Sequence, residues 1–434
     1  MSGAHSRLAA AEILMNVLEE RRTLDEALSL TRSFENLSGP DRGFARAMAS
    51  AALRQLGRLQ IGLAPFLNRP LETATPPSRA LLLIGVAQLW LMDTPSHAGV
   101  GETVAAAKLW PRAKQSAGFL NAVLRKATQN RDAFEAAPPL SIWPEWLQEA
   151  VTKDLGTARS EQLAFAQMSE PNLHLTCKSD QIEPIEADFA AASIETERLP
   201  SGSLMVPSGA VDTYPRYEKG DWWVQDSAAA LPAKLLSGGS DKILVDLCAA
   251  PGGKTMQLAA TGAKVYAVDR SAKRLARVQE NLQRTKMTDK ATLVAEKGET
   301  WRPQKLDETI DGILVDAPCS ALGTLRRHPE GPWIKRKDDL DRYPDIQKRL
   351  LMAALDLVSL GGEVVYCVCS PFSNEGFEVV ESVLKSGRAS RKPIQNAEIA
   401  GFEQCLSPHG DVLTLPQGDM HHDAFFIARL IRKS

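Results

Sequence analysis

The chain has 434 residues, 44% of them hydrophobic, and a formal net charge of −2. This length is too great for one ordinary core and predicts two or three domains, with ample apolar content to fill them. The charge gives no sign of a generally basic nucleic-acid-binding protein, so any phosphate-binding surface must be local.

Nothing in the sequence indicates a membrane segment or a secretion signal. Acids and bases interrupt the first 22 residues, and nowhere do about 18 uncharged apolar residues run together. The six cysteines are scattered without a CxxC pair, which fits neither a disulfide framework nor a zinc site. We therefore expect reduced thiols, a cytoplasmic location and no bound metal.

Residues 5–130 have a helical pattern throughout. Turn sequences at 38–40 and 75–78 divide this region, and we expect an all-α bundle over residues 1–131. One side of a predicted helix, at about 100° per residue, carries four arginines: Arg42, Arg46, Arg54 and Arg58. A charged stripe is more often only solvated, but four arginines without an intervening acid favour a phosphate-binding surface.

The composition changes after residue 131. The stretch AAPPLSIWPEW places three prolines and two tryptophans in a short span, which breaks helices and predicts a linker. We expect residues 132–220 to combine this linker with a small mixed α/β domain, to which the residues assign no chemistry.

From residue 221 to 434 the pattern changes to alternating strands and helices. Apolar runs predict strands at 242–247, 264–268, 312–316, 363–368 and 425–430, with amphipathic segments such as 271–284 between them. β-Branched runs separated by helices predict a parallel sheet covered on both faces, as in a doubly wound α/β domain.

The stretch VDLCAAPGGKTMQLA predicts a cofactor-binding turn after the first of these strands. Gly252 and Gly253 allow close approach of the backbone to a ligand, and a second strand leads to Asp269, which can accept hydrogen bonds from ribose hydroxyls. A glycine-rich turn alone is often only a tight connection. Because the pattern is neither GxGxxG nor a phosphate loop, S-adenosylmethionine, which carries no phosphate, fits better than NAD.

A second candidate stretch, DAPCSALGTLRRHPEGPWIK, begins where strand 312–316 ends. Asp316 lies at the strand tip, and Cys319 follows at the sheet edge where open α/β folds bind ligands. Basic side chains follow closely: Arg326, Arg327, His328, Lys335, Arg336 and Lys337. A basic loop is usually only solvated, but next to an acid, a cysteine and a cofactor turn we expect it to contact phosphate.

The third candidate stretch is YCVCS, residues 366–370. Side chains alternate along a strand, so Cys367 and Cys369 point to the same face. Cys367 lies within the apolar run and is predicted to pack as a small hydrophobe, whereas Cys369 lies where the strand ends. A nucleophilic cysteine needs a partly exposed, electropositive setting, so Cys369 is the first candidate and Cys319 the second.

Together DLCAAPGGKT, DAPCSALGT, RRHPEGPWIK and the Y-x-x-CS strand end resemble the Sun family of RNA cytosine methyltransferases. The N-terminal stretches RALLLIGVAQLWLMDTPSHAGVGETV and SAGFLNAVLRKA resemble the NusB-like RNA-binding domain that is fused to this catalytic unit. The resemblance implies a seven-stranded Rossmann-like domain that uses S-adenosylmethionine to methylate carbon-5 of a cytosine in RNA, with small-subunit ribosomal RNA as the expected substrate.

The resemblance also implies roles for individual residues. Cys369 would be the nucleophile, Cys319 would act in product release, and Asp316 would hold the cytosine edge and border the cofactor. Asp269 would bind the ribose, and the methionine end would be lined by Lys254 and the turn Cys248, Ala249, Ala250, Pro251, Gly252 and Gly253. A base in structured RNA must be unstacked to reach Cys369, so a loop or a partly assembled particle is the expected substrate form.

The sequence departs from the family where AEKGET replaces the usual Gly-Asp-Gly, so Glu296 becomes the candidate acceptor near adenine and Lys297 occupies the aligned place. Two alternatives to the ribosomal RNA methyltransferase stay open. One is a catalytically silent RNA-binding or assembly factor that keeps the fold. The other is a cytosine methyltransferase that acts on transfer RNA or DNA. The sequence identifies no protein partner.

Overall fold

A computed structural model describes residues 3–303, 309–416 and 422–433. The chain forms two compact units: a helical unit, up to Glu170 plus Leu325–Lys337, and a sheet unit, Pro171–Thr324 plus the chain from Asp338. These divisions differ from the expected boundaries after residues 131 and 220. Residues 132–170 belong to the helical unit, in which Phe134 and Trp143 are buried and Phe134 stacks on Trp90 at 5.3 Å between ring centroids.

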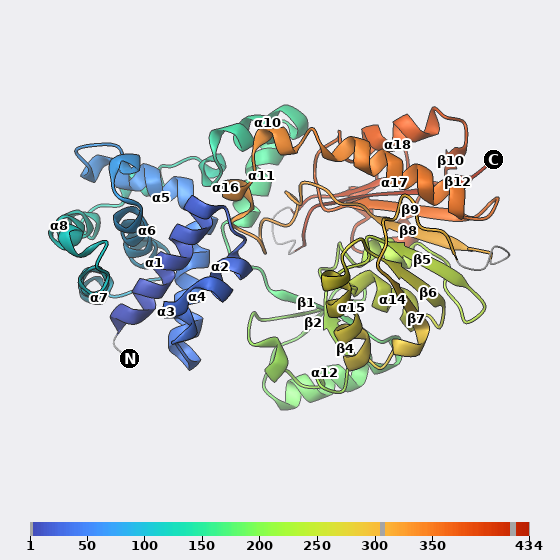
Figure 1. The fold of residues 1–434 in the computed structure, drawn as a ribbon, viewed down its shortest axis with the longest axis horizontal. Helices are drawn as coiled ribbons and strands as arrows, with labels where there is room; N and C mark the ends of the chain where they lie inside the picture. Colours follow the sequence, from blue (N-terminus) through green and yellow to red (C-terminus); the bar gives the residue numbers. More distant parts are fainter. Residues whose placement is uncertain (1–2, 304–308, 417–421, 434) are drawn as a thin grey trace. The chain divides into compact units, whose positions relative to one another are not determined.

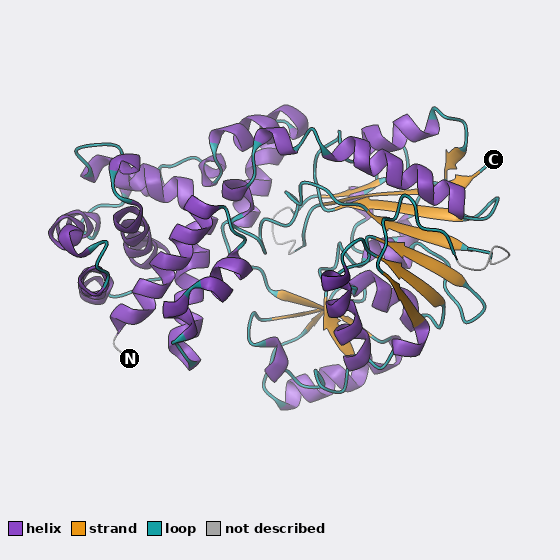
Figure 2. Cartoon of the chain, in the orientation of Figure 1, coloured by secondary structure: helices purple, strands orange, loops and turns teal. Residues whose placement is uncertain are grey.

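The helical unit consists of the following helices: α1 (Gly3–Glu20), α2 (Leu24–Leu30), α3 (Arg32–Glu35), α4 (Gly39–Arg54), α5 (Leu56–Leu63), α6 (Pro76–Leu91), α7 (Ser96–Leu109), α8 (Ala117–Ala127), α9 (Asp132–Glu135), α10 (Glu145–Leu155), α11 (Thr157–Gln167) and α16 (Gly331–Ile334) (Figures 1 and 2). The expected all-α N-terminal bundle is confirmed. None of the helices in the described part of the chain has both the length and the apolar character needed to cross a membrane.

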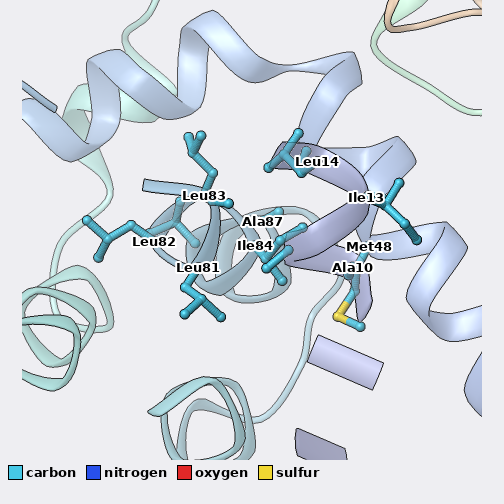
Figure 3. Close-up of a cluster of buried hydrophobic side chains, with 14 of the residues drawn as sticks. Ala10, Ile13, Leu14, Met48, Leu81, Leu82, Leu83, Ile84 and Ala87 are labelled. Carbon is cyan, nitrogen blue, oxygen red and sulfur yellow. The ribbon is translucent and has the colours of Figure 1, made fainter. Parts of the chain in front are cut away.

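The core of the helical unit forms around α1 and α6. Ile13 and Leu14 of α1 and Met48 of α4 are buried with the apolar run 81–87 of α6 (Figure 3). Helix α6 is apolar on every side, which is typical of a helix surrounded by others. On α8, Leu120, Val123 and Leu124 are buried as predicted, but Phe119 is 43% exposed.

The predicted arginine stripe does not lie on one helix. Gln55 has φ −123° and ψ 28°, and this residue separates α4 from α5. Arg42 and Arg46 are exposed, whereas Arg54 and Arg58 are partly buried and are used within the unit. Arg58 donates to Gln55 Oε1 at 2.7 Å and to the carbonyl of Phe134 at 3.1 Å, and it stacks on the Phe134 ring.

Residues 325–337, which we call the strap, leave the sheet unit after Thr324 and pack within the helical unit. Arg54 Nη1 donates to the carbonyl of Arg326 at 2.6 Å, and Arg326 itself is only 2% exposed. Burial lowers the pKa of Arg54 to about 10. Trp333 and Ile334 of α16 pack against the hydrophobic core of the unit. The strap therefore packs against the helical core and buries Arg326, although His328, Arg336 and Lys337 are exposed.

The sheet unit contains two sheets. The smaller has the order β2-β3-β1-β4 and is antiparallel: β1 (Leu173–Cys177), β2 (Glu197–Arg198), β3 (Leu204–Val206) and β4 (Trp222–Val224). Its core includes Trp222 and Phe189, the latter from α12 (Ile182–Ala191). This sheet and helix form a mixed α/β region, and its strand β4 lies beyond residue 220, where the expected region ends.

The larger sheet follows the order β10-β12-β9-β8-β5-β6-β7, with β11 paired to β12 (Figure 1). Its strands are β5 (Ile243–Leu247), β6 (Lys264–Val268), β7 (Ala291–Val294), β8 (Gly312–Asp316), β9 (Glu363–Val368), β10 (Ala389–Arg391), β11 (Val412–Thr414) and β12 (Phe425–Arg432). The pairs from β9 through β7 are parallel, whereas β10, β11 and β12 pair antiparallel. All five predicted strands are present, but the sheet is mixed rather than parallel throughout.

Helices cover both faces of this sheet, as predicted. One face packs on α13 (Leu231–Lys234), α14 (Gly253–Ala260) and α15 (Ala272–Arg284), and the other on α17 (Tyr343–Leu357) and α18 (Phe377–Leu384). Along β9, Cys367 packs with the first group, and Tyr366 and Val368 pack with the second. The predicted alternation of this strand is confirmed.

Replacing Trp333 by Ala should lower the free energy of unfolding of the helical unit by about 2 kcal/mol, less than for a fully buried tryptophan. The indole contributes to the core of that unit from a distant part of the sequence. Hydrogen exchange followed by mass spectrometry should show lower protection in α1 and α4. Trp301→Ala is the matched control, because Trp301 is buried in the sheet unit against Tyr266 and should instead lower protection there. Unchanged exchange in α1 and α4 would contradict this account of the strap.

Candidate active site

The candidate residues gather at the carboxyl ends of four neighbouring strands. β5, β6, β8 and β9 are adjacent and parallel, so the segments that follow them emerge at one edge of the sheet. The register pairs Asp316 at the end of β8 with Cys367 on β9. Cys319 lies three residues after Asp316, and Cys369 lies two residues after Cys367.

The turn after β5 has the backbone that the glycines predicted. Gly252 has φ 103° and caps α14, and a Cβ added there would lie 2.9 Å from Val278 Cγ1. Cys248 also lies in the left-handed region, at φ 64°. A tight left-handed turn of small residues leaves space for a ligand against the backbone.

Asp269, which follows β6, is hydrogen-bonded to this turn. Its carboxylate accepts from the amide of Ala250 at 3.3 Å and from that of Ser271 at 2.9 Å, and Arg274 lies 3.2 Å away. A carboxylate has about four acceptor sites, so these contacts leave capacity for hydroxyl donors.

The candidate acceptor Glu296 is exposed. Burial raises the pKa of Cys248, and among the nearby carboxylates that add to this effect is Glu299. Glu299, which the sequence analysis did not single out, therefore lies within electrostatic reach of the turn.

Lys254 and Asp316 form an ion pair in the centre of the site. Lys254 Nζ is 2.8 Å from Asp316 Oδ2, and the Cys367 thiol donates to Asp316 Oδ1 at 3.4 Å. Burial alone would lower the pKa of Lys254, but the charge of Asp316, with smaller contributions from Cys367 and Cys369, raises it above its usual value. Lys254 is thus a protonated, paired lysine and not a free phosphate ligand, which fits a cofactor without phosphate.

The two cysteine candidates meet in space. The sulfur atoms of Cys319 and Cys369 are 3.4 Å apart, although fifty residues separate them in the sequence. Both side chains are partly exposed, whereas Cys367 is fully buried. The pKa of Cys319 lies well above its usual range, first because it shares a hydrogen bond with Cys369 and second because the surrounding protein removes most of its contact with water. A protonated thiol next to a second cysteine and a protonated lysine can support nucleophilic attack and proton transfer.

Backbone contacts fix the two cysteine loops against each other. The amide of Gly323 donates to the carbonyl of Cys369 at 3.0 Å, and the carbonyl of Gly323 accepts from Ala424 at 2.9 Å. A Cβ at Gly323 would lie 2.0 Å from the carbonyl oxygen of Ala424. The sequence analysis did not predict this close approach, although the small residues in ALGT are a possible signal for it.

Asp246 is a fully buried carboxyl on β5 below the site. Thr255 donates to its Oδ2 at 2.5 Å. Burial raises the pKa of Asp246 to about 7, although the Thr255 hydrogen bond acts in the opposite direction.

The residues expected to bind RNA belong to a different unit of the chain from the two candidate cysteines. Arg42, Arg46, Arg54 and Arg58 belong to the helical unit, and Arg326, Arg327 and His328 lie on the strap, which packs in that unit. That the basic residues after Cys319 contact phosphate stays a prediction. Arg326 is buried, whereas His328 has a 60% exposed side chain.

Two protein families match parts of this sequence. The family described as 16S rRNA methyltransferase RsmB/F matches residues 233–431, and the NusB family matches residues 4–129. The curated ribosomal RNA small subunit methyltransferase B of Pseudomonas putida is 33% identical to the chain over 98% of each protein. The protein of the same name from Pseudomonas syringae pv. tomato is 34% identical over 98% of this chain and 96% of its own.

Solved structures agree with the fold. The crystal structure of PH0851 is similar with a TM-score of 0.77 and 21% identity, over 99% of each chain. The crystal structure of NSun6 from Pyrococcus horikoshii with SFG has a TM-score of 0.59 and 17% identity, over 67% of this chain and 98% of that one.

Asp246→Asn should flatten the dependence of stability on pH between about pH 4 and pH 7. The folded-state pKa of about 7 lies above the unfolded value, about 3.9. The wild type therefore binds an extra proton when folded and loses stability as pH rises through this window. Asparagine keeps an acceptor for Thr255 and does not titrate.

Thermal unfolding at pH 5 and pH 8 checks this prediction. The difference in Tm between the two pH values should be smaller for Asp246→Asn than for the wild type. Thr255→Val removes the hydrogen bond that holds the pKa down, so it should enlarge the difference. Equal differences in wild type and Asp246→Asn would show that Asp246 does not titrate as described.

Proposed function

Because the chain belongs to the 16S rRNA methyltransferase RsmB/F family, we propose that it methylates carbon-5 of a cytosine in small-subunit ribosomal RNA, using S-adenosylmethionine. The observation that carries this proposal is the 3.4 Å approach of the Cys319 and Cys369 sulfur atoms beside the Lys254–Asp316 ion pair. Reduced thiols and a ribosomal RNA substrate favour the cytoplasm as the place of action.

The turn of residues 248–253 and Asp269 would hold the cofactor, with Asp269 on the ribose and Glu296 as the candidate acceptor on the adenine side. The left-handed turn at Gly252, the spare acceptor capacity of Asp269 and the pairing of Lys254 all fit a nucleoside without phosphate. When bound, S-adenosylmethionine supplies an electrophilic methyl group.

The cysteines would act on the base. Carbon-5 of cytosine is a poor nucleophile until the ring is activated, and addition of the Cys369 thiolate at carbon-6 makes carbon-5 enamine-like. Once carbon-5 carries the methyl group, transfer of the carbon-5 proton to water would break the bond from carbon-6 to the Cys369 sulfur and restore the aromatic ring. The Cys319 thiol lies against that sulfur, in a position to assist its release. Asp316, held by Lys254, would accept from the amino edge of the cytosine.

Cys369→Ala should lower methyl transfer to small-subunit ribosomal RNA about a thousandfold or more, because it removes the proposed nucleophile. Cys319→Ala should accumulate a covalent protein–RNA adduct, because sulfur release is impaired. Labelled S-adenosylmethionine measures the first effect and a denaturing gel the second. Cys177→Ala is the matched control, because Cys177 lies on β1 of the smaller sheet and packs against a different core, so it should leave both measurements unchanged.

Full activity in Cys369→Ala would place the nucleophile elsewhere. If the wild type transferred no methyl group to free small-subunit RNA, to ribosomal particles or to transfer RNA, the silent RNA-binding factor would replace this proposal.

The exposed Arg46 is proposed to contact phosphate in the helical unit. Arg46→Ala should reduce the slope of log K against log salt concentration by about 0.7 to 0.9. Arg58→Ala is the matched control: it removes contacts with Gln55 and Phe134, so it should lower stability and leave the slope unchanged. Equal slopes for wild type and Arg46→Ala in an RNA-binding titration would remove Arg46 from the interface.

A further inference from the structure

Both cysteine loops contain the pair Cys-Ser, and both serines bind one buried carboxylate. Glu375 Oε2 accepts from the backbone amide of Ser320 at 2.8 Å, and Oε1 accepts from the hydroxyl of Ser370 at 2.6 Å. The hydroxyl of Ser320 also donates to that of Ser370, at 3.2 Å. Glu375 is fully buried. Each oxygen of this carboxylate thus holds the residue next to one of the two cysteines.

Two further elements bind the same residue. Gln347 of α17 donates from Nε2 to Glu375 Oε2 at 3.0 Å and to the carbonyl of Pro318 at 3.0 Å. The hydroxyl of Tyr366 on β9 donates to the Glu375 carbonyl at 2.5 Å. The carboxylate itself has three partners: the Ser320 amide, the Ser370 hydroxyl and Gln347 Nε2. All three donate, so the ionised side chain is satisfied without a proton of its own.

We infer that Glu375 is the positioning residue that holds the loops of Cys319 and Cys369 so that their sulfur atoms meet. The inference rests on the proposed function, since it assigns these two thiols to one reaction. A carboxylate suits this task because it offers acceptors on two sides at a fixed separation, and a misplacement of about 1 Å can cost about a hundredfold in rate. Because the Glu375 side chain is fully buried, it can position the two loops without touching the substrate.

The charge of Glu375 has a second effect. The pKa of Cys319 is raised first by its hydrogen bond with Cys369 and by burial, and the charge of Glu375 adds to this. Glu375 therefore helps to keep Cys319 in the thiol form while Cys369 acts as the nucleophile, which separates the roles of two adjacent cysteines.

The first test uses Glu375→Ala and Glu375→Asp in the full chain, with S-adenosylmethionine affinity as the check of folding. Both should lower kcat about a hundredfold and leave the KM for RNA within about threefold, because the loops lose their shared anchor while the binding surfaces remain. Glu375→Gln, which keeps one acceptor oxygen and the length, should recover part of the activity. Variants that bind the cofactor normally and keep kcat within about threefold of wild type would overturn the inference.

Two serine variants sharpen this test. Ser320 binds Glu375 through its backbone amide, so Ser320→Ala keeps that bond, whereas Ser370→Ala loses a side-chain donor. Ser370→Ala should therefore be slower than Ser320→Ala, and its effect should not add to that of Glu375→Gln. Glu378→Gln is the matched control, because Glu378 is exposed and its carboxylate accepts from Ser373 at 3.1 Å. Equal rates for the two serine variants would contradict the anchoring geometry.

A second measurement does not depend on methylation. A diazenedicarboxamide oxidant can take two electrons and two protons from the thiols of Cys319 and Cys369 and leave a disulfide, which mass spectrometry detects. The wild type should form it readily, and Glu375→Ala about tenfold more slowly, because the thiols spend less time in contact. Equal rates would overturn the inference even in a protein with no methyl transfer. If Glu375→Ala forms the disulfide about tenfold more slowly than the wild type, but the wild type transfers no methyl group, only the proposed function is rejected.

Discussion

The parallel pairing of β8 with β9 is the constraint on which the site depends. Its register places Asp316 opposite Cys367, so the loops that follow both strands begin side by side. Parallel neighbours lie about 4.8 Å apart, close enough for the short loops to bring two sulfur atoms into contact. A slip of one residue would turn every side chain of β9 to the other face, so that Tyr366 would replace Cys367 beside Asp316.

Two cations partner acids at this edge of the sheet, Lys254 with Asp316 and Arg274 with Asp269. Lys254 pairs with Asp316, and Asp316 in turn accepts from Cys367. The buried Asp246 lies on the adjacent strand without such a partner and avoids charge through its raised pKa. Several buried acids are tolerated under the cofactor site for three reasons. Asp316 is paired with Lys254, Asp246 is partly protonated, and Asp269 accepts from backbone amides.

Much of the catalytic region follows from local sequence, because near-continuous β-branched runs predicted five strands and strand ends predicted Cys319 and Cys369. The arginine stripe was misjudged because helical periodicity detects neither the break at Gln55 nor the carbonyl groups that Arg54 and Arg58 bind. Glu375 could not be found by periodicity, since only strand pairing brings it below both loops. The repeated Cys-Ser pair was a local signal of that arrangement, and the short strands β10 and β11 gave too little pattern to detect.

The strap also affects the order in which the protein can mature during synthesis. A ribosome makes the helices up to Glu170 first, but the segment that completes their core, with Arg326 and Trp333, follows only after β5, β6, β7 and β8. Domains at the N-terminus generally fold as soon as they emerge. Here the strap can dock on the first unit only after most of the parallel sheet has been translated.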